Sequence, residues 1–226
     1  MDHQTVFDHE LADLKETILK MGVLVQELIY KSVEALKNRD KELARSVIEK
    51  DKEVDKLELE IDEKYINMIA LRQPKASDLR FITTGVRIAT DLERIGDLAE
   101  DIAERALEIA DQPLLKPLID IPKMAKLSQN SLAMVLDAFV NRDPQKAKAV
   151  WENENEVDKL QAQVHDELLQ IMTNDSSTVS RGIPLLLASR HLERISDHAT
   201  NIGEDVVYMV EGKVVKHSGA EELHHG

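Results

Sequence analysis

Four pairs of acidic residues in this chain share one spacing, four positions apart. The pairs are Asp51 with Asp55, Glu93 with Asp97, Glu154 with Asp158, and Glu193 with Asp197. Side chains at positions i and i+4 of a helix lie on the same face, one turn apart. Two carboxylates held there repel each other by roughly a few tenths of a kcal/mol, and a bound cation would reverse the sign of that term. The spacing therefore predicts cation binding if the pairs lie on helices.

An acidic helical protein can also carry such pairs on a surface that only faces water. At about 100° per residue, Asp97 lies about 40° and Asp101 about 80° from Glu93, whereas Ile95 and Ile102 lie on the opposite side. The acids of this segment thus point away from its apolar residues, as charges on a solvated face do. Each pair taken alone is interpreted most simply in this way.

The position of the pairs relative to the expected turns favours metal binding. Antiparallel neighbouring helices place residues that are equidistant from their shared turn at the same height. The first two pairs are centred on positions 53 and 95, whose midpoint is Pro74, and the other two on 156 and 195, whose midpoint lies in the turn 174–177. Four carboxylates at one height across a helix–helix groove suit a metal ion, and this arrangement occurs twice.

Two further positions extend the predicted ligand set. Asp101 continues the acidic stripe after Asp97, and the neutral Asn201 stands at the corresponding place after Asp197, so the two sites need not be equal. Oxygen ligands alone favour hard cations such as Mg²⁺, Mn²⁺ or iron. The predicted metal ligands are Asp51, Asp55, Glu93, Asp97, Asp101, Glu154, Asp158, Glu193, Asp197 and Asn201.

Other polar residues near the stripe are given structural roles. Asp62 and His165 occupy equivalent positions further along the stripe and could join a site, but an exposed polar role is favoured. His191 and His198 flank the last acidic pair at helical angles off the stripe, which favours a surface or packing role.

The elements that would carry these residues are helices. Between about residues 11 and 35, apolar and small side chains recur in alternating steps of three and four, a heptad pattern typical of long packed helices. Turn residues and prolines then divide the chain into six expected helices. The first helix ends at the turn 38–40, the second spans about 41–71 and the third about 78–110. The fourth reaches about 140 and ends at the turn 141–144, the fifth runs on to about 172, and the sixth spans about 179–211, with Gly212 as its C-cap.

The two halves of the chain resemble each other in sequence. Asn-Arg-Asp at 38–40 recurs 103 positions later at 141–143, and Glu-Val-Asp-Lys-Leu at 53–57 recurs with the same offset at 156–160. Leu-Glu-Arg-Ile at 92–95 recurs 100 positions later. Three collinear matches indicate a duplication. We expect an all-α fold of two tandem three-helix bundles, with six long antiparallel helices: a first bundle at 1–111, a proline-containing linker at 112–122, a second bundle at 123–213, and a polar tail at 214–226.

Composition limits the possible partners. The 226 residues include 29 Lys and Arg against 43 Asp and Glu, a net charge of −14, with 42% hydrophobic residues and no cysteine. This amount of apolar material predicts a packed core. The acidic balance disfavours nucleic acid and anionic lipid, and the absence of cysteine removes disulfides and thiolate metal sites. We see neither a signal core nor a run of ~18 apolar residues, and expect a cytoplasmic protein with no direct membrane insertion.

Two longer segments resemble a known family. Leu-Arg-Gln-Pro-Lys-Ala-Ser-Asp-Leu-Arg at 71–80 followed by Asp-Leu-Glu-Arg-Ile-Gly-Asp at 91–97 is similar to the first repeat of the PhoU family. Arg-His-Leu-Glu-Arg-Ile-Ser-Asp-His-Ala-Thr-Asn-Ile at 190–202 is similar to its second repeat. The similarity covers roughly residues 5–213, duplication and linker included.

This resemblance implies a function that the spacing of residues does not. PhoU-like proteins carry multinuclear metal clusters, associated with iron and zinc, on Glu/Asp-x-x-x-Asp motifs. They restrain the phosphate-starvation response and are thought to link the ATPase subunit of a phosphate ABC transporter to a sensor histidine kinase. We accordingly expect a regulatory adaptor, not an enzyme, that forms a homodimer and binds iron, zinc, manganese or magnesium.

Two alternative functions remain open from the sequence. A metal-dependent helical-bundle enzyme would need an open metal position and a general base, and no distinct base is evident. A purely structural helical adaptor would use its acids only for solvation. The metal content of the purified protein distinguishes the purely structural adaptor from the regulatory adaptor and the enzyme. A turnover assay identifies the enzyme.

Overall fold

The computed structural model describes residues 3–215, and this part of the chain is helical with no β-strand. Its helices are α1 (His3–Asn38), α2 (Lys41–Arg72), α3 (Ala76–Ile109), α4 (Asp120–Asn141), α5 (Pro144–Lys148), α6 (Val150–Asn174) and α7 (Val179–Glu211), with a 3₁₀ turn at Ser176–Thr178. The predicted all-α class is confirmed. The predicted tail falls mostly on residues 216–226, which lie outside the described residues.

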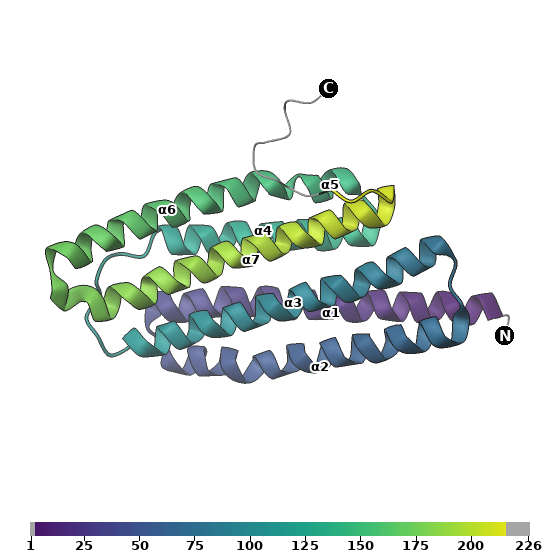
Figure 1. The fold of residues 1–226 in the computed structure, drawn as a ribbon. Helices are drawn as coiled ribbons and strands as arrows, with labels where there is room; N and C mark the ends of the chain where they lie inside the picture. The colour runs from purple at the N-terminus through teal and green to yellow at the C-terminus, as the bar shows by residue number, and fades with distance from the viewer. Residues whose placement is uncertain (1–2, 216–226) are drawn as a thin grey trace, which may run out of the picture.

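The helices form two three-helix bundles that lie side by side (Figure 1). Helices α1, α2 and α3 pack on one another, and α4, α6 and α7 form the second group, with the short α5 against α7. The groups are joined where α3 runs along α7 and α1 along α4. Arg87 bonds Asp205 at 3.0 Å, and Asp91 bonds His198 at 2.8 Å, so α3 and α7 are antiparallel. The expected tandem arrangement is confirmed.

The first turn of each bundle uses the same local chemistry. Arg39 and Arg142 adopt the left-handed backbone conformation, with φ of 57° and 53°, and terminate α1 and α4. The following Asp40 accepts a hydrogen bond from the backbone N–H of Leu43 at 2.9 Å, and Asp143 caps α5 in the same way. A capping carboxylate satisfies N–H groups that the helix itself leaves unpaired. The repeated Asn-Arg-Asp tripeptide is thus a repeated helix stop and start.

The fifth expected helix, which runs from the turn 141–144 to about 172, is interrupted in the structure. It divides at Ala149 into α5 and α6, although the backbone there remains close to helical, at φ −66° and ψ −14°. The interruption lies where α7 comes close: a Cβ on Gly203 would stand 3.0 Å from the carbonyl oxygen of Ala147. Just past the C-terminal end of α7, Gly212 is confirmed as the C-cap, with φ of 68°.

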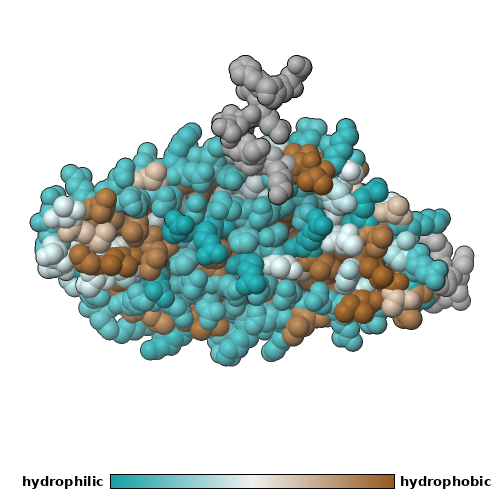
Figure 2. Space-filling model, viewed as in Figure 1, coloured by the Kyte–Doolittle hydropathy of each residue, from teal (hydrophilic) through white to brown (hydrophobic). Residues whose placement is uncertain are grey.

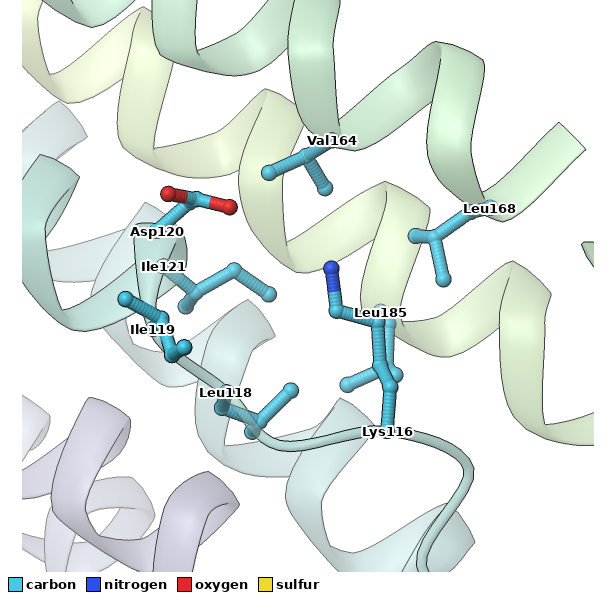
Figure 3. Close-up of a pocket in the computed structure, with 8 residues that line it drawn as sticks. All are labelled: Lys116, Leu118, Ile119, Asp120, Ile121, Val164, Leu168 and Leu185. Atoms are coloured by element: carbon cyan, nitrogen blue, oxygen red, sulfur yellow. The ribbon is translucent and has the colours of Figure 1, made fainter.

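The linker between the bundles lies slightly earlier in the chain than expected, between the end of α3 at Ile109 and the start of α4. Helix α4 begins at Asp120, before the predicted boundary at 123, and its first turn accommodates Pro122, since a missing N–H donor is tolerated there. Leu115 and Leu118 of the linker pack on the core. Lys116 extends from the linker toward α6, where it pairs with Glu167 beside a narrow apolar pocket (Figure 3).

The surface separates polar from apolar regions along the length of the molecule. In Figure 2, hydrophilic side chains cover the middle of the visible face, and hydrophobic patches gather toward its two ends. Exposed apolar residues occur near both interhelical turns, including Leu71 and Leu79 on one side and Val179 and Ile183 on the other. Within residues 3–215, none of the helices is long and apolar enough to cross a membrane.

Candidate metal centres

Three carboxylates meet in the groove between α2 and α3. Asp51 comes from α2, and Asp97 and Glu100 come from α3; each offers an oxygen, and these atoms lie within 4.8 Å of one another. Asp51 is only 5% exposed, and its Oδ1 is buried without a hydrogen-bond partner. A buried carboxylate oxygen without a donor is costly, and a cation would satisfy it.

The burial of Asp51 follows from its place in the apolar stripe of α2. It lies four positions after Val47 and three before Val54, both fully buried, so it faces the interior with them. Gly96 on α3 provides the space, because a Cβ there would stand 2.6 Å from Oδ1 of Asp51. The solvated-face interpretation is therefore wrong for Asp51.

The electrostatics of this first centre disfavour negative charge. Burial raises the pKa of Asp51, the charges of Glu100, Asp55, Asp97 and Glu93 add to this effect in that order, and together they bring it to about 7. Burial likewise raises the pKa values of Glu93, Asp97 and Glu100. Arg94 offsets part of this repulsion by pairing with Asp97 at 3.3 Å and Glu93 at 3.4 Å. That guanidinium is 57% exposed, so its pairing is weakened by solvent.

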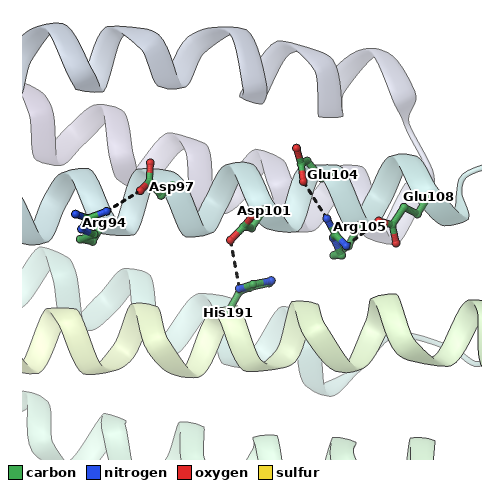
Figure 4. Close-up of polar contacts among 7 residues, drawn as sticks. All are labelled: Arg94, Asp97, Asp101, Glu104, Arg105, Glu108 and His191. Atoms are coloured by element: carbon green, nitrogen blue, oxygen red, sulfur yellow. Dashed lines mark hydrogen bonds and ion pairs between the residues drawn. The ribbon is translucent and has the colours of Figure 1, made fainter.

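The other predicted residues of the first half are placed differently. Glu93 is half-buried, and its buried Oε2 accepts no hydrogen bond, although Nε of Arg94 lies 3.4 Å away as an ion-pair partner. Asp55 is exposed. The structure does not bring Asp101 into the cluster. Its carboxylate points toward α7, where Oδ2 lies 3.7 Å from Nδ1 of His191, while Asp97 points away from α7 (Figure 4).

A second carboxylate group lies between α6 and α7. Asp158, Glu193 and Asp197 have oxygens within 4.8 Å of one another. Burial raises the pKa of Asp197 to about 6, with Glu193 as the next contributor. Glu154 also neighbours Asp197, and its Oε2 accepts a hydrogen bond from the buried Thr200 hydroxyl at 2.9 Å.

The other predicted or neighbouring polar residues differ in their burial. Ser196 is almost fully buried, and its Oγ lacks a hydrogen-bond partner. Asn201 is exposed. The polar role predicted for Asp62 and His165 agrees with their exposure, and His191 and His198 lie at the seam between α3 and α7.

The donor sets of both centres fit a hard metal ion. Each groove gathers at least three carboxylates, and the first also contains buried carboxylate oxygens without hydrogen-bond partners. Carboxylate oxygens are the ligands that Mg²⁺, Mn²⁺ and iron accept readily. Of the predicted residues, the structure brings together Asp51 with Asp97 in the first groove, and Asp158 with Glu193 and Asp197 in the second.

Sequence reasoning missed Glu100 and Glu58. Glu100 lies three positions after Asp97 and seven after Glu93, which is the same helical face. Glu58 lies seven positions after Asp51, and its pKa is raised by burial and by neighbours that include Asp55. The i+7 spacing was the signal available for both.

Comparison with known proteins shows the same architecture in relatives. The PhoU domain matches residues 18–106 and again residues 121–206. A phosphate-specific transport system accessory protein PhoU homolog from Aquifex aeolicus is 42% identical over 213 residues, which is 94% of this chain and 96% of that protein. The PhoU protein of Escherichia coli is 35% identical over 217 residues, covering 96% and 90% of the two chains.

Solved structures agree with this assignment. The crystal structure of PhoU from Pseudomonas aeruginosa superposes with a TM-score of 0.88 at 36% identity, over 92% of this chain and 100% of that one. The phosphate transport system regulatory protein PhoU from Streptococcus pneumoniae gives a TM-score of 0.87 at 32% identity, over 93% and 99%. With both domain repeats, the curated relatives and these structures in agreement over nearly its whole length, the chain belongs to the PhoU family.

Proposed function

We propose that this chain is a metal-binding regulatory accessory protein of phosphate uptake that restrains the phosphate-starvation response when phosphate is plentiful. Its membership of the PhoU family supports this role, because relatives matched over most of their length are named as accessory proteins of a phosphate-specific transport system. One solved relative is named as a regulatory protein of phosphate transport.

The metal-binding part of the proposal rests on one observation above all. Asp51 is buried with an oxygen that no donor contacts, in a groove shared with Asp97 and Glu100. Such a site is unfavourable when empty and becomes favourable with a bound cation. Iron, zinc, manganese or magnesium ions would be held by the carboxylates of the two grooves, where they would neutralise charge and tie α2 to α3 and α6 to α7.

The proposed partners are the ATPase subunit of a phosphate ABC transporter and a sensor histidine kinase, with the protein acting in the cytoplasm as a homodimer. A negatively charged helical bundle offers long, rigid faces for protein contacts and repels nucleic acid. We propose no turnover for the chain itself. A metal-dependent enzyme would convert a substrate at one of the grooves, and a metal-free adaptor would function equally well without the carboxylates.

A complementation experiment tests this role. In a bacterium that lacks its own PhoU-family protein, we expect the phosphate-starvation reporter to stay on in rich phosphate and to be silenced by expression of this chain. A variant with Glu93→Gln and Asp97→Asn should silence it poorly, whereas the exposed Glu53→Gln should behave as the parent. A reporter that stays on with the parent chain, at normal expression, would contradict the regulatory role.

Binding and assembly are tested with purified proteins. The chain should retain the transporter's ATPase subunit and the kinase on an affinity column, and should sediment as a dimer. Retention of neither partner would remove the proposed link, and a monomer at micromolar concentration would remove the dimer.

A further inference from the structure

The two metal centres differ in which positions come together. In the second half, the close group contains Asp158, Glu193 and Asp197. The corresponding positions of the first half are 55, 93 and 97, yet the close group there contains Asp51, Asp97 and Glu100. The first group therefore lies further along the groove, toward the C-terminal end of α3.

Position 100 and its counterpart explain part of this difference. Glu100 adds a carboxylate to the first groove, whereas the repeat places Thr200 at the same point of the second. Thr200 is 4% exposed and donates a hydrogen bond to Oε2 of Glu154, the counterpart of Asp51. In the second half, this position thus contributes a donor to a carboxylate and no negative charge of its own.

Position 96 and its counterpart explain the rest. Gly96 leaves space for Oδ1 of Asp51 against the backbone of α3. Ser196 fills the corresponding place in the second half and is buried. The carboxylate of Asp51 can therefore sit deep in the first groove, with one unpartnered oxygen among the ligands, while the second groove has a hydroxymethyl group at that depth.

We propose that Glu100 is a metal ligand of the first centre and makes this centre bind a divalent cation more tightly than the second. This inference rests on the metal binding proposed above. Glu100, Asp51 and Asp97 together present three carboxylates around one point, and Glu93 and Asp55 supply further negative charge nearby. Affinity for a hard cation rises with the number of charged oxygen ligands. The second centre has fewer carboxylates, because Thr200 replaces one of them.

The test is a Mn²⁺ titration of the metal-stripped full chain, followed by calorimetry and by the EPR signal of the free ion. The parent protein should show a tight and a weak class of sites. Glu100→Gln keeps the shape of the side chain but removes its charge. This substitution should lower the Mn²⁺ affinity of the tight class by at least ~10–100-fold, the loss that removal of a partner beside a metal ligand already causes. The Mn²⁺ affinity of the weak class should not change.

A control variant and a variant of the second centre show which class of sites belongs to which groove. Glu108→Gln, two turns further along α3 where the carboxylate is exposed and pairs with Arg105, should leave both classes unchanged. Glu193→Gln should weaken only the weak class. The inference is overturned if Glu100→Gln leaves the tight class intact, or if Glu193→Gln removes it. Two classes of equal affinity in the parent would also overturn it while leaving metal binding in place, whereas no Mn²⁺ binding at all would refute the proposed metal function itself.

Discussion

Replacing Asp51 by Asn should stabilise the metal-free protein, and the gain should grow with pH. The carboxyl group of Asp51 has a pKa of about 7 in the folded protein and an ordinary value of 3.8. At ~1.36 kcal/mol per pKa unit, the cost of ionising this group in the fold is about 4 kcal/mol. Asn keeps the shape of the side chain and cannot ionise.

The sign of the pH dependence follows from proton binding. Between pH 3.8 and about 7, the folded state holds a proton on Asp51 that the unfolded state has lost, so the parent protein loses stability as pH rises through this range. Above about 7 both states are ionised, and the loss levels off. The advantage of Asp51→Asn should therefore increase from pH 5 to about 7 and then remain constant.

Urea unfolding followed by circular dichroism, in the presence of a chelator, measures this difference. Glu53→Gln, exposed two positions away on α2, serves as the control and should change the unfolding free energy by less than about 0.5 kcal/mol at every pH. If Asp51→Asn destabilised the metal-free protein at pH 8, or if its effect did not depend on pH, the burial and repulsion described here would not govern this residue.

Three other predictions concern substitutions in the first bundle, two at the metal centre and one at the cap of α2. Glu93→Gln with Asp97→Asn should leave the metal-free melting temperature unchanged or slightly raised, since repulsion of a few tenths of a kcal/mol is relieved. The same double change should abolish the stabilisation of ~2.7 kcal/mol expected from Mn²⁺ at 100 times its dissociation constant. Equal shifts in melting temperature with and without metal would mean that these acids are only solvated. Gly96→Ala should force Asp51 out of its place and weaken Mn²⁺ binding to the first centre about tenfold or more in a calorimetric titration, and unchanged affinity would contradict the close contact. Asp40→Ala should lower the free energy of unfolding by about 1 kcal/mol in urea, through loss of the cap on α2, and no loss would contradict the capping role.

Much of the fold was predictable because its signals are local. Heptad spacing of apolar residues determines the long helices, and the Asn-Arg-Asp turns at 38–40 and 141–143 mark where one helix stops and the next begins. The interruption at Ala149 was not predictable in this way. It coincides with the close approach of Gly203 on a helix more than fifty residues away, which helical periodicity does not describe.

The candidate sites were predictable only along each helix. The i,i+4 pairs and the turn midpoints placed the carboxylates at the correct heights, since both depend on helix geometry alone. The choice between Glu100 and Asp101 depends on which neighbour each side of α3 faces. Relative to Glu93, Glu100 lies at about −20° and Asp101 at about 80°, and the packing of α7 on the latter side directs Asp101 to His191. The burial of Asp51 likewise depends on Gly96, a contact between two helices.

The most direct test of metal binding is an anomalous diffraction experiment on crystals grown with Mn²⁺. The three histidines of the tail, His217, His224 and His225, should be removed by ending the chain at residue 215, so that they cannot supply an unrelated site. We predict anomalous peaks in both grooves, one among Asp51, Asp97 and Glu100 and one among Asp158, Glu193 and Asp197. Well-ordered grooves without such peaks at saturating Mn²⁺ would contradict the account.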